Sequence, residues 1–299
     1  MQKFVLAAAL VPFAIACGGA SSIDESNDDV TAVTDQLFSV RRDERACAAP
    51  ACGGFFATAI LQNTAASYVT SLDLAKAGLD APTRQSVLAA PSEELLLQGH
   101  LSAADKRGFH KLVVKNAWRG MPGIVPAAND LLYTVAERAP QITCVAAPCN
   151  NQIATEAASG KATAVTRSSV AGAARAFVDR TWLENRVVLH GALVAAHVAA
   201  GQKMAGGTES VLEASQVWMH LPETAGPCAM PREQVCGAGQ VQSYERTPDR
   251  CVEPAGCVTL GVCPRAVQPS CADGYLASTW AASPDACPAT ACDPAWVVQ

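Results

Sequence analysis

The 299-residue chain has few of the features by which most functions are recognised. It contains no G-x-S-x-G, no H-E-x-x-H, no P-loop and no dinucleotide-binding fingerprint, so no common catalytic site is indicated. Only 16% of its residues are charged and the net charge is −5, so it lacks the basic surplus of nucleic-acid-binding proteins. We therefore expect a non-enzymatic protein that uses no cofactor or metal and binds no nucleic acid.

Long hydrophobic runs are also missing, with one exception near the N-terminus. The uncharged run Phe4–Ala16 follows Lys3 and has 13 residues, too few to span a bilayer comfortably but the usual size for a signal-peptide core. No other segment approaches membrane-spanning length without charge or proline. Residues 1–16 are thus predicted to be a signal peptide.

Two ways of processing this leader are compatible with the sequence. Ala14 and Ala16 satisfy the A-x-A rule for ordinary secretion, whereas Ala-Ile-Ala-Cys-Gly resembles a bacterial lipobox with Cys17 as the lipidated residue. Of the 13 cysteines, removing Cys17 leaves an even number, which suits pairing in an oxidising compartment. We predict a lipid-anchored extracytoplasmic protein with an acidic tether over residues 17–36. By resemblance to the sorting of enterobacterial lipoproteins, Gly18 after the cysteine, in place of Asp, favours the outer over the inner membrane. Simple secretion is the alternative.

The other twelve cysteines fall into duplicated patterns. Cys47 and Cys52 form a C-x4-C motif that recurs as Cys144 and Cys149, each with an intervening proline. A zinc site is conceivable for such thiols, but behind a signal peptide disulfides are favoured. We predict that each motif closes on itself, since four intervening residues with a turn-forming proline bring the two Cα atoms within disulfide reach.

Two copies of a module of about a hundred residues precede the tail, at residues 37–125 and 130–222. Three segments recur in the same order: Phe38–Leu61 with Tyr133–Ala157, Leu95–Ala104 with Val187–Ala196, and Leu112–Trp118 with Leu212–Trp218. A repeat of this length indicates duplicated domains rather than a solenoid, whose units have about 20–50 residues.

Each module reads as mainly β with one short helix. Period-two alternation places Leu112, Val114 and Trp118 on one strand face, which favours core packing of the tryptophan over a ligand-binding role. Helices are expected after the capping residues Asp80 and Ser169, the second over residues 170–184. Gly99 and Gly191 are expected within corresponding strands, at a bend or a close backbone approach. The predicted class is α+β, mainly β, with tandem small sheets or partial barrels followed by disulfide-rich repeats.

The C-terminal region consists of two cysteine-rich repeats, residues 228–257 and 263–292. Each has few aliphatic residues and therefore depends on disulfides, with three connectivities open for its four cysteines. The pattern is weakly similar to small cysteine-rich inhibitor and adhesion modules such as the antistasin-like type, but the spacings differ too much to carry any inhibitory residue across. The eight cysteines are Cys228, Cys236, Cys251, Cys257, Cys263, Cys271, Cys287 and Cys292.

A broader resemblance covers the first module best. The aromatic-x-V-R-R-D start at Phe38, the C-A-A-P-x-C-G-G motif from Cys47 and the later L-x-V-x-x-A-W ending at Trp118 resemble an uncharacterised domain family in predicted lipoproteins of Gram-negative soil bacteria. The resemblance implies an envelope location and no particular activity.

The chain offers one candidate ligand-binding patch, formed by Arg41, Arg42 and Arg45, although a charge run beside a turn is more often a solvated face. The histidines lack metal-ligand spacing. We expect an envelope lipoprotein with a structural or binding role, whose partners are the membrane and an envelope or extracellular protein. The alternatives are a protease inhibitor acting through the tail repeats and, less favoured, an extracytoplasmic hydrolase.

Overall fold

The computed structural model describes residues 34–62, 64–139, 145–223, 228, 232, 234–263 and 269–297. The predicted leader, residues 17–33 of the predicted tether with Cys17, and also Cys144 lie outside these ranges. The last residue of the predicted tether, Gln36, is the first residue of a strand. Within them, no helix combines the length and the apolar character that crossing a membrane requires.

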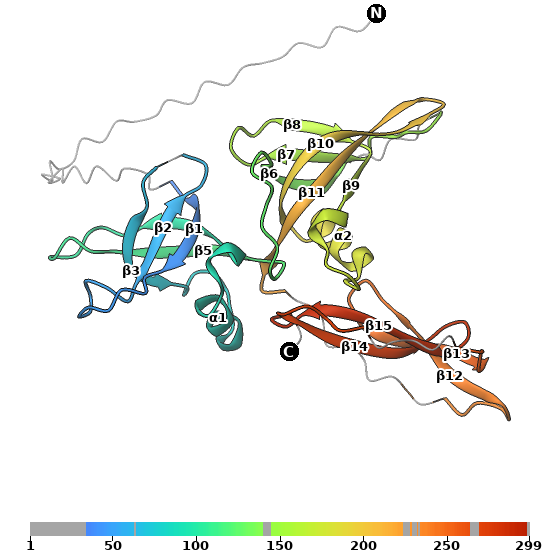
Figure 1. Ribbon diagram of the computed structural model, residues 1–299. Coiled ribbons are helices and arrows are strands. Elements are labelled where there is room, and N and C mark those ends of the chain that lie inside the picture. The colour runs from blue at the N-terminus through green and yellow to red at the C-terminus, as the bar shows by residue number, and fades with distance from the viewer. Residues whose placement is uncertain are drawn as a thin grey trace, which may run out of the picture. The chain divides into compact units, whose positions relative to one another are not determined.

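The first module is a closed five-stranded barrel (Figure 1). Its strands are β1 (Gln36–Arg42), β2 (Phe55–Ala59), β3 (Ser67–Asp73), β4 (Leu95–Leu101) and β5 (His110–Gly120). The order around the barrel is β1, β2, β3, β5, β4 and back to β1; the pairing of β3 with β5 is parallel and the others are antiparallel. The sheet curves until its two edges meet, which closes the barrel. The predicted mainly β class is thus confirmed.

A short helix connects β3 to β4 in this barrel. Helix α1 (Ala81–Leu88) begins after Asp80, whose carboxylate accepts a hydrogen bond from the Thr83 N–H at 2.8 Å. Its Val87 is buried in the barrel core, and the 3-10 turn η1 (Ser92–Glu94) then leads into β4. The capping residue predicted from the sequence is therefore the one that the structure uses.

The second module repeats this connectivity. Its strands are β6 (Leu131–Glu137), β7 (Gln152–Glu156), β8 (Ala162–Val165), β9 (Arg167–Ser169), β10 (Leu193–Met204) and β11 (Gly207–Leu221). The third strand of the first barrel corresponds here to two pieces, of which β8 pairs with β7 and β9 pairs in parallel with β11. Between them and β10 lie the 3-10 turn η2 (Ala171–Ala173) and helix α2 (Arg180–Leu189).

The expected second helix is wrong in its position. The segment after Ser169 makes only the turn η2, and the helix starts ten residues later, capped by Asp179 through its bond to the Trp182 N–H. The stripe that faces the core is Trp182, Leu183 and Val187, so the cap and the apolar face agree at this later start.

Gly191 is likewise misplaced by the sequence comparison. It lies between α2 and β10 with φ of +66°, a conformation that favours glycine, and not within a strand. The strand register gives the correct correspondence between the two modules. Leu97 pairs with Phe38 and Val194 pairs with Tyr133, so Leu97 corresponds to Val194. Gly99 does lie within β4, and a Cβ there would come 1.9 Å from the Val113 carbonyl oxygen.

The two barrels are joined through their last strands, β5 and β11, which pair antiparallel. Trp118 lies opposite His220, and Gly120 lies opposite Trp218. Because the two strands occupy the same place in each copy, this pairing relates the copies by an approximate two-fold axis. Both tryptophans are buried in one small cluster with Leu37, Leu96, Leu193 and Ala195.

The position of Trp118 corrects the face predicted for it. The register of β4 with β5 shifts where Gln98 faces Asn116 and Gly99 faces Val114, so β5 carries an extra residue, Lys115. Such a bulge reverses the alternation beyond it. Leu112 and Val114 therefore point into the barrel core, while Trp118 lies in the cluster between the barrels.

The tail forms a four-stranded sheet in the order β13, β12, β14, β15. The strands are β12 (Gln240–Arg246), β13 (Val252–Thr259), β14 (Tyr275–Ala282) and β15 (Cys287–Pro294). In each repeat the first cysteine bonds to the third and the second to the fourth: Cys228–Cys251, Cys236–Cys257, Cys263–Cys287 and Cys271–Cys292.

The tail sheet also shares hydrophobic contacts with the second barrel. Tyr275 and Cys292 are buried in the same cluster as Trp182 and Met219. The Cys292 N–H donates a 2.8 Å hydrogen bond to the Phe177 carbonyl oxygen. The second repeat thus gains core contacts that its own composition does not supply.

Candidate functional site

Strand alternation gives the β1–β3 meander of the first barrel an inner and an outer face. Val40, Ala57 and Val69 point inward and are nearly inaccessible in the barrel core. Their neighbours in the alternation, which include Arg41 and Phe56, point outward. The outer face is therefore where this barrel presents polar and aromatic groups to solvent.

Three outward residues form a row across these strands. In the register of the sheet Arg41 faces Phe56, and Phe56 in turn faces Tyr68. The guanidinium carbon of Arg41 lies 5.0 Å from the centroid of the Phe56 ring, within the range of a cation–π contact. Phe56 and Tyr68 meet edge to face at 5.6 Å, and Phe109 extends the aromatic row with its ring 6.2 Å from Tyr68.

The loop between β1 and β2 borders this row and is held in place by several bonds. It contains the disulfide Cys47–Cys52. The Tyr68 hydroxyl donates to the Pro50 carbonyl oxygen at 2.9 Å and accepts from the Gly54 N–H at 3.2 Å. A Cβ on Gly54 would lie 2.2 Å from the Val69 carbonyl oxygen, so the close approach of loop and strand requires glycine.

Arg45 and Asp43 add a polar link at the start of the same loop. Arg45 donates from Nε and from one terminal nitrogen to the two Asp43 oxygens, both at 2.8 Å. Its guanidinium carbon also lies 5.2 Å from the Phe56 centroid and 5.7 Å from that of Tyr68. The hydrogen bonds from Arg45 lower the pKa of Asp43, and those to Asp43 raise the pKa of Arg45, so this pair stays charged and mutually neutralised.

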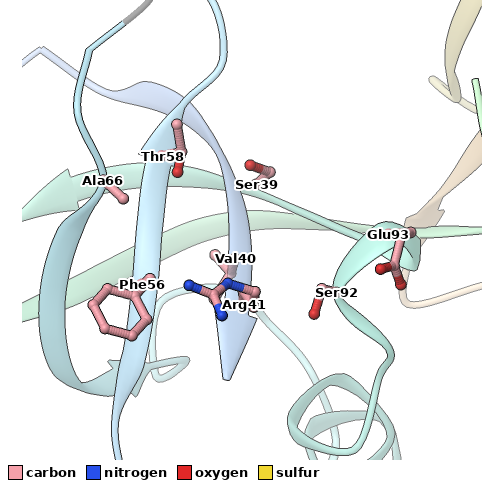
Figure 2. Close-up of a pocket in the computed structure, with 8 residues that line it drawn as sticks. All are labelled: Ser39, Val40, Arg41, Phe56, Thr58, Ala66, Ser92 and Glu93. Atoms are coloured by element: carbon pink, nitrogen blue, oxygen red, sulfur yellow. The ribbon is translucent and has the colours of Figure 1, made fainter. Parts of the chain in front are cut away.

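A cavity of about 340 Å³ opens on this outer face (Figure 2). Figure 2 shows the Arg41 guanidinium beside the Phe56 ring, with Ser92 and Glu93 of η1 on the other side of Arg41. Ser39 and Thr58 face each other on β1 and β2 and add two hydroxyl groups. The complete lining is Ser39, Val40, Arg41, Phe56, Thr58, Ala66, Ser92 and Glu93.

The arginines of the predicted patch are divided by the structure. Arg41 and Arg45 come together at the Phe56 ring. Arg42 pairs with Phe55 in the register and so points to the other side of the strand. The sequence reading missed Phe56, Tyr68 and Phe109, which contribute the apolar part of the surface. The only sequence signal for the first two was that each occupies an outward position of its strand.

The second barrel lacks an equivalent row. The buried pair Val135 and Ala154 corresponds to Val40 and Ala57 of the first barrel. At the next outward positions Ala136 lies opposite Ile153, and Ile153 lies opposite Ala164. Arginine, phenylalanine and tyrosine are thus replaced by small or aliphatic residues. The aromatic–arginine surface belongs to the first barrel alone among the described parts of the two copies.

The second barrel instead carries a small polar cluster around His197. Its Nδ1 lies 3.0 Å from Asp130 and its Nε2 lies 3.6 Å from Glu213. These carboxylates are distant in sequence, so the sequence reading did not connect them with the histidine. Across the described residues, no three His, Cys, Asp or Glu side chains gather in a group able to hold a metal ion.

The second C-x4-C motif is described only at Cys149. Cys149 is disulfide-bonded, while its predicted partner Cys144 lies outside the described residues. With five further disulfides in the described chain, the protein is suited to an oxidising extracytoplasmic environment.

Strand order, parallel closure and the helix before the fourth strand define the class of this protein. Both modules have the Greek-key barrel topology of the OB-fold. The chain belongs to a family defined by a domain of unknown function, DUF6748, which matches residues 36–224. That match spans both barrels and stops before the tail. Comparison with curated proteins and with solved structures gave no match.

Proposed function

We propose that this protein is a non-enzymatic, lipid-anchored binding protein of the cell envelope, whose first barrel holds its ligand on the outer face of β1–β3. The observation that carries the proposal is the row Arg41, Phe56 and Tyr68 beside a cavity and a disulfide-closed loop. Half-buried aromatic rings next to charged groups are the composition typical of binding sites.

The asymmetry between the two copies supports a specialised role for the first one. Both barrels have the same connectivity, yet the second has Ala136, Ile153 and Ala164 at the corresponding places. Packing within a barrel does not require the outward side chains, so their difference reflects what each surface contacts. The second barrel then acts chiefly as a structural partner, joined through β5 and β11.

Attachment to the membrane follows from the leader. Cys17, behind an apolar run of signal-peptide length, would carry the lipid, and the residues between Cys17 and β1 would serve as the tether, with the outer membrane as the favoured location. Labelling with a fatty-acid analogue tests this directly: it should mark the wild type and not Cys17→Ser, and label on both proteins would refute lipidation at this residue.

The binding face is tested by co-sedimentation with envelope fractions. The full mature chain carrying Cys17→Ser, which keeps it free of lipid, should sediment with the envelope material. The double variant Arg41→Ala/Phe56→Ala should remain in the supernatant, whereas Ile153→Ala, at the matching place of the second barrel, should sediment normally. Equal sedimentation of all three proteins would contradict the assignment of the face.

A second candidate role belongs to the tail. Large aliphatic side chains are exposed there on a disulfide-held sheet and its connections, among them Val241, Leu260, Val262 and Leu276. Such a surface favours contact with a protein partner, and an extracellular protease is the alternative proposed from the cysteine spacing. Inhibition of a protease that is abolished by Leu276→Asp, and unaffected by Arg41→Ala/Phe56→Ala, would favour this alternative.

A further inference from the structure

We infer that the ligand of the first barrel is an uncharged glycan, with one sugar ring seated in the cavity between β1, β2 and η1. This inference rests on the proposed function and adds the chemical class of the ligand. It follows from the groups that line the cavity, from their balance of charge and from the rigidity of the loop beside it.

The lining matches the two kinds of surface on a sugar ring. A pyranose presents hydroxyl groups around its edge and C–H groups on its faces. Three lining residues, Ser39, Thr58 and Ser92, offer hydroxyls that both donate and accept hydrogen bonds. Arg41 adds several planar donors and Glu93 adds two acceptor oxygens, which suits neighbouring hydroxyl groups. The Phe56 ring supplies an apolar wall for the C–H groups.

The charges at this surface are balanced, which argues against a polyanion. The cavity contains one guanidinium, from Arg41, and one carboxylate, from Glu93. Arg45 is neutralised by Asp43 through two hydrogen bonds of 2.8 Å. A strand of nucleic acid or an acidic polysaccharide carries repeated negative charges and requires a surplus of cations along its path. The net charge of −5 makes such a surplus still less available.

The dimensions and rigidity of the site also suit a short stretch of glycan. Its volume of about 340 Å³ lies at the lower end of the range for small-ligand sites, enough for one or two sugar rings. The neighbouring rings of Tyr68 and Phe109 continue the surface outside the cavity. The Cys47–Cys52 disulfide and the Tyr68 hydroxyl hold the loop before any ligand arrives, which lowers the entropy cost of binding.

Titration calorimetry on the full mature chain with Cys17→Ser tests this inference. The probes are neutral hexamers of β-1,4-linked glucose and of β-1,4-linked N-acetylglucosamine, compared with oligogalacturonate and with a single-stranded oligothymidylate. We expect at least one neutral hexamer to bind, with an affinity that stays the same as the salt concentration rises. We expect no measurable binding of the two polyanions.

Three variants connect that binding to the cavity. Arg41→Ala/Phe56→Ala should lower the affinity for the neutral hexamer by about thirtyfold or more. Glu93→Gln, a conservative change at an exposed residue, should lower it by about threefold to tenfold. Ile153→Ala should bind as the wild type does. Unchanged thermal unfolding of the variants will show that they remain folded.

The outcomes separate the ligand class from the binding face. Salt-sensitive binding of a polyanion, or binding of no neutral hexamer while co-sedimentation still depends on Arg41 and Phe56, overturns the glycan assignment and leaves the binding face in place. Neutral binding that is unaffected by Arg41→Ala/Phe56→Ala overturns the location of the site. If no neutral hexamer binds, and if sedimentation with the envelope material is also unaffected by Arg41→Ala/Phe56→Ala, the proposed function is overturned as well.

Discussion

Arg41 and Phe56 lie directly opposite each other on β1 and β2, with the guanidinium carbon 5.0 Å from the ring centroid. The pair sits at the outer face of a closed barrel, so neither side chain is needed to fill its core. Arg45 approaches the same ring from the disulfide loop at 5.2 Å. An arginine of β1 and an arginine of the disulfide loop therefore both contact the Phe56 ring. This ring lies at the centre of the surface to which we assign ligand binding.

The disulfide loop should be stabilised by its own bridge. Replacing Cys47 and Cys52 together by serine should lower the free energy of unfolding by about 2 kcal/mol, because the closed loop is short and restricts the unfolded chain only moderately. Hydrogen exchange should increase for amides 43–54 and stay unchanged in α2. An equal increase throughout the first barrel would show that the loop is required for the whole fold.

The Asp43–Arg45 pair predicts a pH dependence with a definite sign. Arg45 lowers the pKa of Asp43 below its ordinary value of 3.8, so the carboxylate stabilises the folded state at any pH above that value. This contribution should disappear as the pH falls through the lowered pKa of the folded state. The wild type should therefore be more stable than Asp43→Asn at pH 7 in urea denaturation, and the difference should vanish in strong acid.

If the difference between the wild type and Asp43→Asn were instead to grow toward low pH, the charged pair would not be the origin of the effect. Asp80→Asn serves as the comparison, since the pKa of Asp80 is also lowered, but by the helix cap at Thr83. That variant should show the same pH trend without any change in the hydrogen exchange of the loop.

Gly54 should tolerate no side chain. In Gly54→Ala the added methyl group would approach the Val69 carbonyl oxygen to 2.2 Å, and backbone atoms would have to move. We expect a loss of about 2 kcal/mol or more in the free energy of unfolding. Gly237→Ala is the matched control, because its nearest atom, 3.3 Å away, is the end of the Gln240 side chain. Similar stability of the two variants would show that the contact at Gly54 is not close in solution.

The tryptophan cluster should couple the two barrels. Trp118 is buried between them and its indole N–H donates to the Gly191 carbonyl oxygen at 3.0 Å. Trp118→Ala should lower the free energy of unfolding by about 3–5 kcal/mol. In calorimetry we expect the wild type to unfold in one transition and the variant in two. Leu276→Ala, at a half-exposed side chain of the tail, should change the stability by less than about 0.5 kcal/mol.

The sequence predicted the mainly β class and the resemblance to a family of unknown function because both depend on local patterns. Features set by long-range pairing were not accessible in this way. The face of Trp118 depends on the bulge at Lys115, which only the β4–β5 register reveals. Helix α2 begins at Arg180, capped by Asp179, and not after Ser169. Both capping residues are of a type that favours a helix start, so the sequence alone does not choose between them.

The site was only partly visible for the same reason. The arginine run near Arg41 stands out in the sequence, so a ligand patch was proposed there. Phe56, Tyr68 and Phe109 come from three separate segments, which become neighbours only when β1, β2 and β3 pair and the loop before β5 folds beside them. The domain boundaries and the attachment of lipid to Cys17 stay predictions.

Hydrogen–deuterium exchange of the full mature chain, with and without solubilised envelope material, tests the central claim most directly. If the outer face of the first barrel binds the ligand, amides in residues 39–45, 54–58 and 66–70 should become protected, while residues 134–137 and 152–156 at the matching place in the second barrel should not change. Protection confined to the second barrel or to the tail strands would contradict the account.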